Sequence, residues 1–232
     1  MRRLIITQSE ADLTSHAGLG LIGAALNERT DLAADSEAVS PLRGDAMPHA
    51  NILSSYVALL CLGKSDFEAI TGFREDEYFA TALGLDQVPS EGILRQRMDA
   101  NAAAYKAVVE EAAIVFLRRS GARFTPLDND LVPLDCDVTP FDNSQSKKEG
   151  VSRTYKGMDG YAPMAAYLGQ EGYCLEMELR EGKQHCQKGT PQFLQRVIGR
   201  ARQLTATPLL LRLDGACSIA RRTMSESTSK RL

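Results

Sequence analysis

The chain has 232 residues, of which 44% are hydrophobic and 25% are charged, and its formal net charge is -3 at pH 7. This length and composition are ordinary for a globular protein with one large domain or two small ones. The slightly acidic balance excludes an overall positive field, so any contact with nucleic acid has to come from local basic clusters.

Cysteine usage and hydropathy indicate the compartment. The five cysteines are odd in number and form no CxxC pair, which argues against a disulfide framework and a structural zinc site. No stretch approaches the roughly 20 apolar residues that span a bilayer, and the first apolar run is too short for a signal peptide. We therefore expect a cytoplasmic protein with no membrane partner.

Residues from about 15 to 120 have the periodicity of helices. The run Ser65-Asp66-Phe67-Glu68 fits a capping box, and glycines follow the apolar runs. Arg95 and Arg97 lie near the start of the last helix, in an order of short helices that resembles a helix-turn-helix. A helical bundle with solvated arginines fits the same pattern. The expected helices cover residues 16–29, 49–62, 66–70, 76–83 and 89–119.

After Gly121 the periodicity becomes that of strands, with one further amphipathic helix, and residues 141–160 form an expected polar loop. The fold class is therefore α+β or α/β, a helical domain followed by a mixed sheet with a helix. We expect a helical domain at 1–122, a sheet domain at 123–214 and a tail without apolar periodicity at 215–232. The expected strands cover residues 124–132, 134–139, 161–168, 173–179 and 208–213, and the helix covers residues 191–204.

Two of these strands carry carboxylates at their ends. In the strand 134–139, alternation places Asp135 and Asp137 on one face and apolar side chains on the other. Asp214 follows the strand 208–213 and would lie beside Asp137 if the two strands pair in parallel, with the expected helix as the crossover. Neighbouring carboxylates repel unless a divalent cation neutralises them, and Mg²⁺ suits all-oxygen ligands. Aspartates at strand ends also serve as simple turn formers.

The expected polar loop is basic in places, with Lys147, Lys148, Arg153 and Lys156. Cations in this loop can contact phosphates while the acid at the strand end holds metal, a combination that suits a phosphodiester substrate.

Other polar residues have more than one interpretation. His185 and Cys186 are either loop residues that touch DNA or solvent, or a Cys/His nucleophile. Arg180 and Arg212 either contact phosphate or pair with local acids.

The amino-acid sequence of the second half of the chain closely resembles DDE transposases of bacterial insertion sequences. The resemblance covers residues from about 10 to 214 and includes the helical part, for example the run PSEGILRQR at 89–97. The most specific runs are LDCDVTPFDNSQSKKEGVSRTYKG at 134–157, DGYAP at 159–163, ELREGKQHCQKGTP at 178–191 and LRLD at 211–214.

This resemblance implies a helical region that binds the DNA ends of the element, and a ribonuclease-H-like catalytic domain whose first two acids lie on its first and fourth strands. On that pattern Asp137, in an Asp-x-Thr context, is the first catalytic aspartate and metal ligand, and Asp214 is the second. Asp135 is a weaker metal candidate. The family cuts double-stranded DNA and joins it to a target with Mg²⁺, usually as a dimer. The DNA-binding candidates are Lys147, Lys148, Arg153, Lys156, Arg95 and Arg97.

The sequence departs from the family after Asp214. Such proteins continue with a helix, further strands and a third acid, whereas residues 215–232 contain a single acid, Glu226. We therefore expect a truncated or frameshifted transposase with an incomplete sheet, a disordered tail and little activity, which acts as a homodimer or a heterodimer with full-length transposase. The alternative is a non-catalytic DNA-binding remnant that occupies element ends or inhibits the full-length protein.

Overall fold

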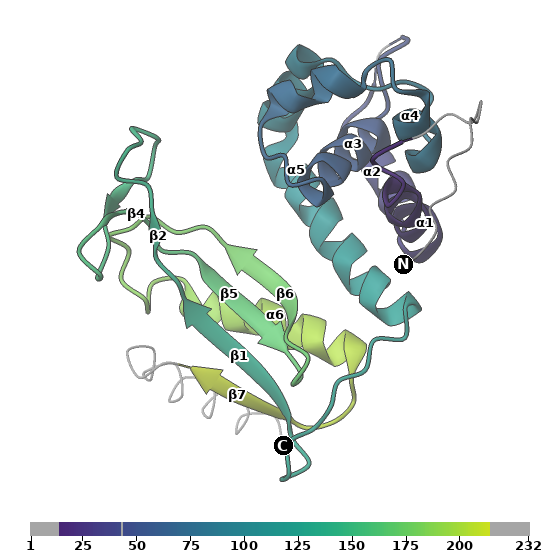
Figure 1. Ribbon diagram of the computed structural model, residues 1–232. Coiled ribbons are helices and arrows are strands. Elements are labelled where there is room, and N and C mark those ends of the chain that lie inside the picture. The colour runs from purple at the N-terminus through teal and green to yellow at the C-terminus, as the bar shows by residue number, and fades with distance from the viewer. Residues whose placement is uncertain (1–13, 43, 214–232) are drawn as a thin grey trace, which may run out of the picture. The chain divides into compact units, whose positions relative to one another are not determined.

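The computed structural model describes residues 14–42 and 44–213 (Figure 1). Contacts divide the chain into two units, residues 1–112 and 113–232. Helices make up the described part of the first unit, and strands with one covering helix dominate the second. The predicted fold class, a helical N-terminal region followed by a mixed sheet with a helix, is therefore confirmed. Within the described ranges, no helix is long and apolar enough to cross a membrane.

The helical unit buries one apolar core. Ile52, Leu59, Phe79 and Leu94 have no exposed surface and belong to the same cluster. The long last helix, α5, contains non-helical backbone at Asn101 (φ -122°, ψ 17°). The helices are α1 (Leu19–Arg29), α2 (Leu32–Glu37), α3 (His49–Cys61), the 3-10 helix η1 (Phe67–Phe73), α4 (Glu77–Leu83) and α5 (Glu91–Arg119).

Two details of the helical unit differ from the sequence-based prediction. The six-residue helix α2 has no counterpart in the prediction, because so short a segment shows no apolar period. The predicted capping box is wrong: η1 is a 3-10 helix, whose turn is tighter than an α-turn, and its N-cap is Asp66, not Ser65, with no side-chain capping hydrogen bond. In α4, by contrast, Asp76 Oδ1 accepts a hydrogen bond from the Phe79 N–H at 3.1 Å.

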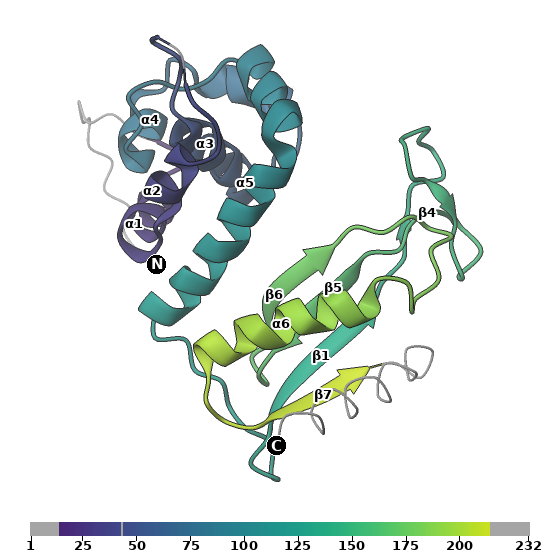
Figure 2. The same cartoon turned by 180° about the vertical axis from the view of Figure 1, so that it is seen from behind.

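The main sheet has four strands in the order β6-β5-β1-β7. β1 (Val132–Val138) pairs antiparallel with β5 (Met164–Leu168), which pairs antiparallel with β6 (Tyr173–Glu178). β1 also pairs in parallel with β7 (Leu209–Leu213), and the connection runs through α6 (Thr190–Leu204), which lies across one face of the sheet (Figure 2). The predicted order of strand, hairpin, helix and parallel strand is confirmed.

A buried carboxylate fixes α6 on this face of the sheet. The Glu176 side chain on β6 is fully buried; its Oε1 accepts from Arg196 Nε at 2.8 Å and its Oε2 from Arg200 Nη1 at 2.6 Å. The hydrogen bond that Arg196 donates to Glu176 is the main reason that the pKa of Arg196 is raised. Without these arginines the buried Glu176 carboxylate would be left uncompensated, which is unfavourable, so the two ion pairs fix the register of α6 against β6.

The predicted strand 124–132 is wrong except at its end, since β1 begins at Val132. The preceding residues form a turn in which the Leu127 N–H donates to the Leu131 carbonyl at 2.9 Å. Asp130 adopts a left-handed φ of 60°, a conformation that aspartate and asparagine tolerate better than other side chains. The turn-forming residues 128–130 therefore prevent a strand here, although the apolar residues on either side favour one.

The segment 141–160, expected to be a loop, instead folds into a small antiparallel sheet in the order β2-β4-β3. Its strands are β2 (Phe141–Asp142), β3 (Ser152–Arg153) and β4 (Asp159–Tyr161). Strands of two or three residues are too short for an alternating pattern, so the sequence does not reveal them. They bring Arg153 of this segment beside the end of β1.

Candidate functional site

Asp137 lies near the end of β1, on the face of the strand opposite α6. Leu134 and Cys136 point into the core under α6, whereas Asp137 is exposed, as strand alternation predicts. Its Oδ1 accepts from the Val138 N–H at 2.8 Å, and the Thr139 hydroxyl is 3.5 Å from its Oδ2. These local contacts orient the carboxylate and leave it open to solvent, so it is available as an oxygen ligand.

Asp135, on the same face of β1, is engaged in an ion pair. The parallel register places it opposite Arg212 of β7, whose Nε and Nη2 both donate to its carboxylate. This bidentate contact is the main reason that the pKa of Arg212 is raised. Of the two interpretations for Arg212, the structure shows pairing with a local acid. Asp135 thus has both carboxylate oxygens occupied by a guanidinium.

Asp214 lies outside the described residues. The strand that leads to it ends with Leu213, which pairs with Cys136, the residue before Asp137. Within the described ranges, no group of three or more His, Cys, Asp or Glu side chains converges as a metal site. The described part of the site therefore contributes one open carboxylate, Asp137.

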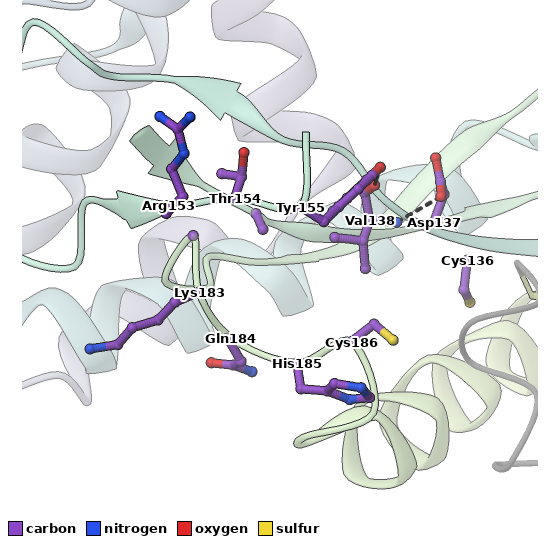
Figure 3. Close-up of a pocket in the computed structure, with 12 residues that line it drawn as sticks. Cys136, Asp137, Val138, Arg153, Thr154, Tyr155, Lys183, Gln184, His185 and Cys186 are labelled. Atoms are coloured by element: carbon purple, nitrogen blue, oxygen red, sulfur yellow. Dashed lines mark hydrogen bonds between the residues drawn. The ribbon is translucent and has the colours of Figure 1, made fainter. Parts of the chain in front are cut away.

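A cavity of about 520 Å³ opens beside Asp137. Figure 3 shows its two walls: Arg153, Thr154 and Tyr155 lie on one side, and the segment 183–186 lies on the other. Thr154 is buried and donates to the Met158 carbonyl at 2.9 Å, which stiffens the turn between β3 and β4. The second wall is not predicted from the sequence, although residues 182–186 lie within the specific run 178–191. The cavity can accept an extended polar group next to the carboxylate.

The four cations of segment 141–160 are all exposed on the small sheet and its turns. Arg153 lines the cavity and lies 3.7 Å from Asp159, while the Lys156 ammonium lies 5.9 Å from the ring centre of Tyr155. Lys147 and Lys148 occupy the connection between β2 and β3. The structure thus brings one of these cations, Arg153, to the cavity that Asp137 lines.

Arg95 and Arg97 belong to the helical unit. Arg95 is exposed; it pairs with Glu91 at 2.6 Å and lies 5.7 Å from the ring centre of Phe67. Arg97 is directed inward, since its Nη2 donates to Nδ1 of the buried His49 at 2.9 Å. Its guanidinium therefore takes part in an internal polar network.

His49 holds this network together. Its Nδ1 lies 2.7 Å from the hydroxyl of Tyr105, and its Nε2 lies 3.1 Å from the carbonyl oxygen of Ser40. Burial lowers the pKa of His49 below its ordinary value of 6.5; the Ser40 carbonyl opposes the shift and the charge of Arg97 adds to it. The imidazole is therefore neutral, with Nε2 donating to Ser40 and Nδ1 accepting from Arg97.

These observations define an α+β protein with an open carboxylate at a strand end and, beside it, a cavity that Arg153 and Lys183 help to line. The chain belongs to the family described as Transposase DDE domain group 1, whose model matches residues 2–228. The match includes most of the segment after Asp214, where the sequence predicts a departure from the family. No curated protein and no solved structure matches the chain significantly.

The lowered pKa of His49 predicts a pH-dependent stability. The unfolded chain protonates this histidine as the pH falls through 6.5, while the folded state resists protonation. The contribution of His49 to the free energy of unfolding is therefore complete above pH 6.5 and is lost as the pH falls below it. We expect the melting temperature, measured by circular dichroism from about pH 5 to 8, to fall on the acid side. His49→Gln should flatten this dependence, and an unchanged slope in that variant would contradict the assignment.

Proposed function

We propose that this chain is an insertion-sequence transposase whose sheet unit performs metal-dependent phosphoryl transfer on DNA. Asp137 and Asp214 are the proposed catalytic residues and metal ligands. The observation that carries this proposal is the parallel pairing of β1 and β7, in which Leu213 lies opposite Cys136. The chain therefore reaches Asp214 one residue after a position that is paired with the neighbour of Asp137. Family membership supports the same chemistry.

The residues present fit a hard divalent cation. Asp137 offers carboxylate oxygens on an exposed strand face, and Mg²⁺ prefers such ligands together with water. When bound, the metal would polarise a phosphoryl oxygen and neutralise the charge that develops during in-line attack. The chain itself orients Asp137 through the Val138 N–H and supplies cations for phosphate groups. Asp135 remains a weaker ligand candidate, because metal binding there requires it to release Arg212.

Double-stranded DNA is the proposed partner, and the ends of the element are the proposed target. Lys147, Lys148, Arg153 and Lys156 form an exposed basic cluster on the small sheet, which suits sequence-independent phosphate contacts. In the helical unit, exposed Arg95 is available for DNA-end contacts, and Arg97 would first have to leave His49. A homodimer, or a heterodimer with full-length transposase, is the proposed assembly.

Replacing Asp137 tests the metal site without requiring catalysis. When Fe²⁺ replaces Mg²⁺ and ascorbate and peroxide are added, hydroxyl radicals should cut the polypeptide near residues 137 and 214. Asp137→Asn should abolish these cuts because it removes a charged ligand. Asp135→Asn, which keeps an acceptor for Arg212, should leave them largely intact. Cuts that persist in Asp137→Asn, as mapped by mass spectrometry, would refute the site.

The lysines of the small sheet should determine how steeply the affinity for duplex DNA falls as the salt concentration rises. Each lysine that contacts a phosphate contributes about one unit to the slope of log affinity against log salt concentration. We expect the double variant Lys147→Ala, Lys148→Ala to lower this slope by about two, as measured by fluorescence anisotropy with labelled duplex. Arg202→Ala, which removes one positive charge from the helix on the opposite face of the main sheet, is the control and should leave the slope unchanged. Equal slopes for both variants would exclude these lysines from the interface.

We further propose that residues 1–232 on their own nick DNA poorly, because Glu226 is the only carboxylate after Asp214 in this sequence and the family uses three acids. Losing one member of a catalytic set that acts as a unit costs about 10⁴-fold in comparable enzymes. In a nicking assay with Mg²⁺ and duplex carrying the element end, we expect no more product than Asp137→Asn gives. Robust Mg²⁺-dependent nicking would overturn this proposal. A chain without nicking activity would act by binding element ends or by pairing with full-length transposase.

A further inference from the structure

Arg180 is a buried cation that follows β6 directly and is only 3% exposed. Its Nε donates to Glu178 Oε1 at 2.7 Å, and its Nη1 donates to the Cys186 carbonyl at 3.2 Å and to the Thr190 hydroxyl at 3.1 Å. The guanidinium carbon lies 5.8 Å from the ring centre of Phe193 on α6. Arg180 therefore connects the end of β6, the start of α6 and the segment between them.

One N–H-bearing atom of Arg180 is left without a partner. Nη2 is buried, and no hydrogen-bond partner for it exists among the described residues. A buried unsatisfied donor carries a desolvation cost, so stabilisation of the fold alone does not explain why this guanidinium is buried. Its contact with the Cys186 carbonyl points instead to the control of a loop.

That loop, residues 182–186, is held at both ends. A side-chain carbon at Gly182 would come within 2.0 Å of the Ser152 carbonyl oxygen, so only glycine allows the segment to pass so close to β3. Next to it, the Lys183 N–H donates to the Ser152 hydroxyl at 3.0 Å. At the other end, both Arg180 and Thr190 donate to the Cys186 carbonyl. The segment thus spans from the small sheet to the start of α6.

The same segment forms the wall of the cavity that faces Arg153 and Tyr155, and Gln184 and His185 extend from it (Figure 3). The Gln187 N–H donates to Nδ1 of His185 at 3.3 Å. In the neutral imidazole, Nε2 then carries the hydrogen and can donate to a phosphate oxygen. The Gln184 amide can donate as well, although its Nε2 lies 3.0 Å from the Lys188 carbonyl in this structure.

We propose that Arg180 is a positioning residue: by holding the Cys186 carbonyl, it fixes segment 182–186 so that Gln184 and His185 contact the phosphate backbone of the DNA strand that lies against Asp137. This assignment rests on the proposed function and adds a second protein wall to its DNA site. The strand passes between this wall and the side of Arg153 and Tyr155. Arg180 itself does not touch the substrate.

The chain offers a closely matched control. Arg196 pairs with the same Glu178 and lies 5.7 Å from the ring centre of the same Phe193, but its described contacts do not include segment 182–186. Arg180→Met leaves Glu178 paired with Arg196, and Arg196→Met leaves it paired with Arg180. Both variants therefore remove one guanidinium from the same cluster, and only the first releases the loop.

The test combines DNA affinity with amide hydrogen exchange, using a fluorescein-labelled mixed-sequence duplex with Mg²⁺ at low salt. We expect DNA to slow exchange at residues 182–186 in the native chain. Arg180→Met should speed exchange there and weaken affinity about three- to tenfold, the effect of one or two lost hydrogen bonds. Arg196→Met should lower the melting temperature without changing affinity. If Arg180→Met fails to fold by circular dichroism, Thr190→Val, which removes one donor to the same carbonyl, replaces it.

A double-mutant comparison separates positioning from general destabilisation. The variant Gln184→Ala, His185→Ala should lose affinity to a similar degree, and adding Arg180→Met to it should cause no further loss. Equal affinities of Arg180→Met and Arg196→Met, or a further additive loss in the combined variant, would overturn the proposal. A native chain that binds no duplex would overturn the proposed function together with it. Normal DNA binding and Asp137-dependent Fe²⁺ cuts with unchanged Arg180→Met affinity would remove this inference alone.

Discussion

The sheet unit depends on one topological constraint, the parallel pairing of β1 with β7. Parallel neighbours cannot be joined by a tight turn, so the chain has to cross one face of the sheet, and it does so through α6. The apolar side chains Phe193 and Val197 and the buried carboxylate of Glu176 hold α6 in place. If this helix shifted, β7 would lose its register, and Leu213 would no longer lie opposite Cys136.

The same constraint assigns different tasks to the two faces of the sheet. The face under α6 is filled by apolar side chains and the Glu176 ion pairs, so it stabilises the fold. Asp135 and Asp137 project from the opposite face, where Arg212 neutralises the first and leaves the second open. Two carboxylates on adjacent same-face positions would repel each other strongly without such a partner. Arg212 thereby distinguishes a paired aspartate, Asp135, from an open one, Asp137.

The basic surface beside Asp137 arises from local arrangement and not from overall charge, since the chain carries a net charge of -3. The small sheet of β2, β3 and β4 places Arg153 at the cavity, and its turns expose Lys147, Lys148 and Lys156. Segment 182–186 closes the cavity from the other side because Gly182 allows a very close approach to β3. The lining of the cavity thus brings the cations Arg153 and Lys183 together with the Asp137 carboxylate.

The sequence by itself determined the elements with a local apolar period, namely helices α3 and α6, the β5–β6 hairpin and the alternating strand β1, because this periodicity is contained in consecutive residues. It also singled out Asp137 as a candidate. Tertiary structure alone decided that Arg212 occupies Asp135, that Arg97 turns inward to His49, and that residues 182–186 form a cavity wall. Each of these contacts joins residues from separate elements. Which side chains meet when they are far apart in the sequence depends on how the elements pack, and a local sequence pattern contains no information on that packing.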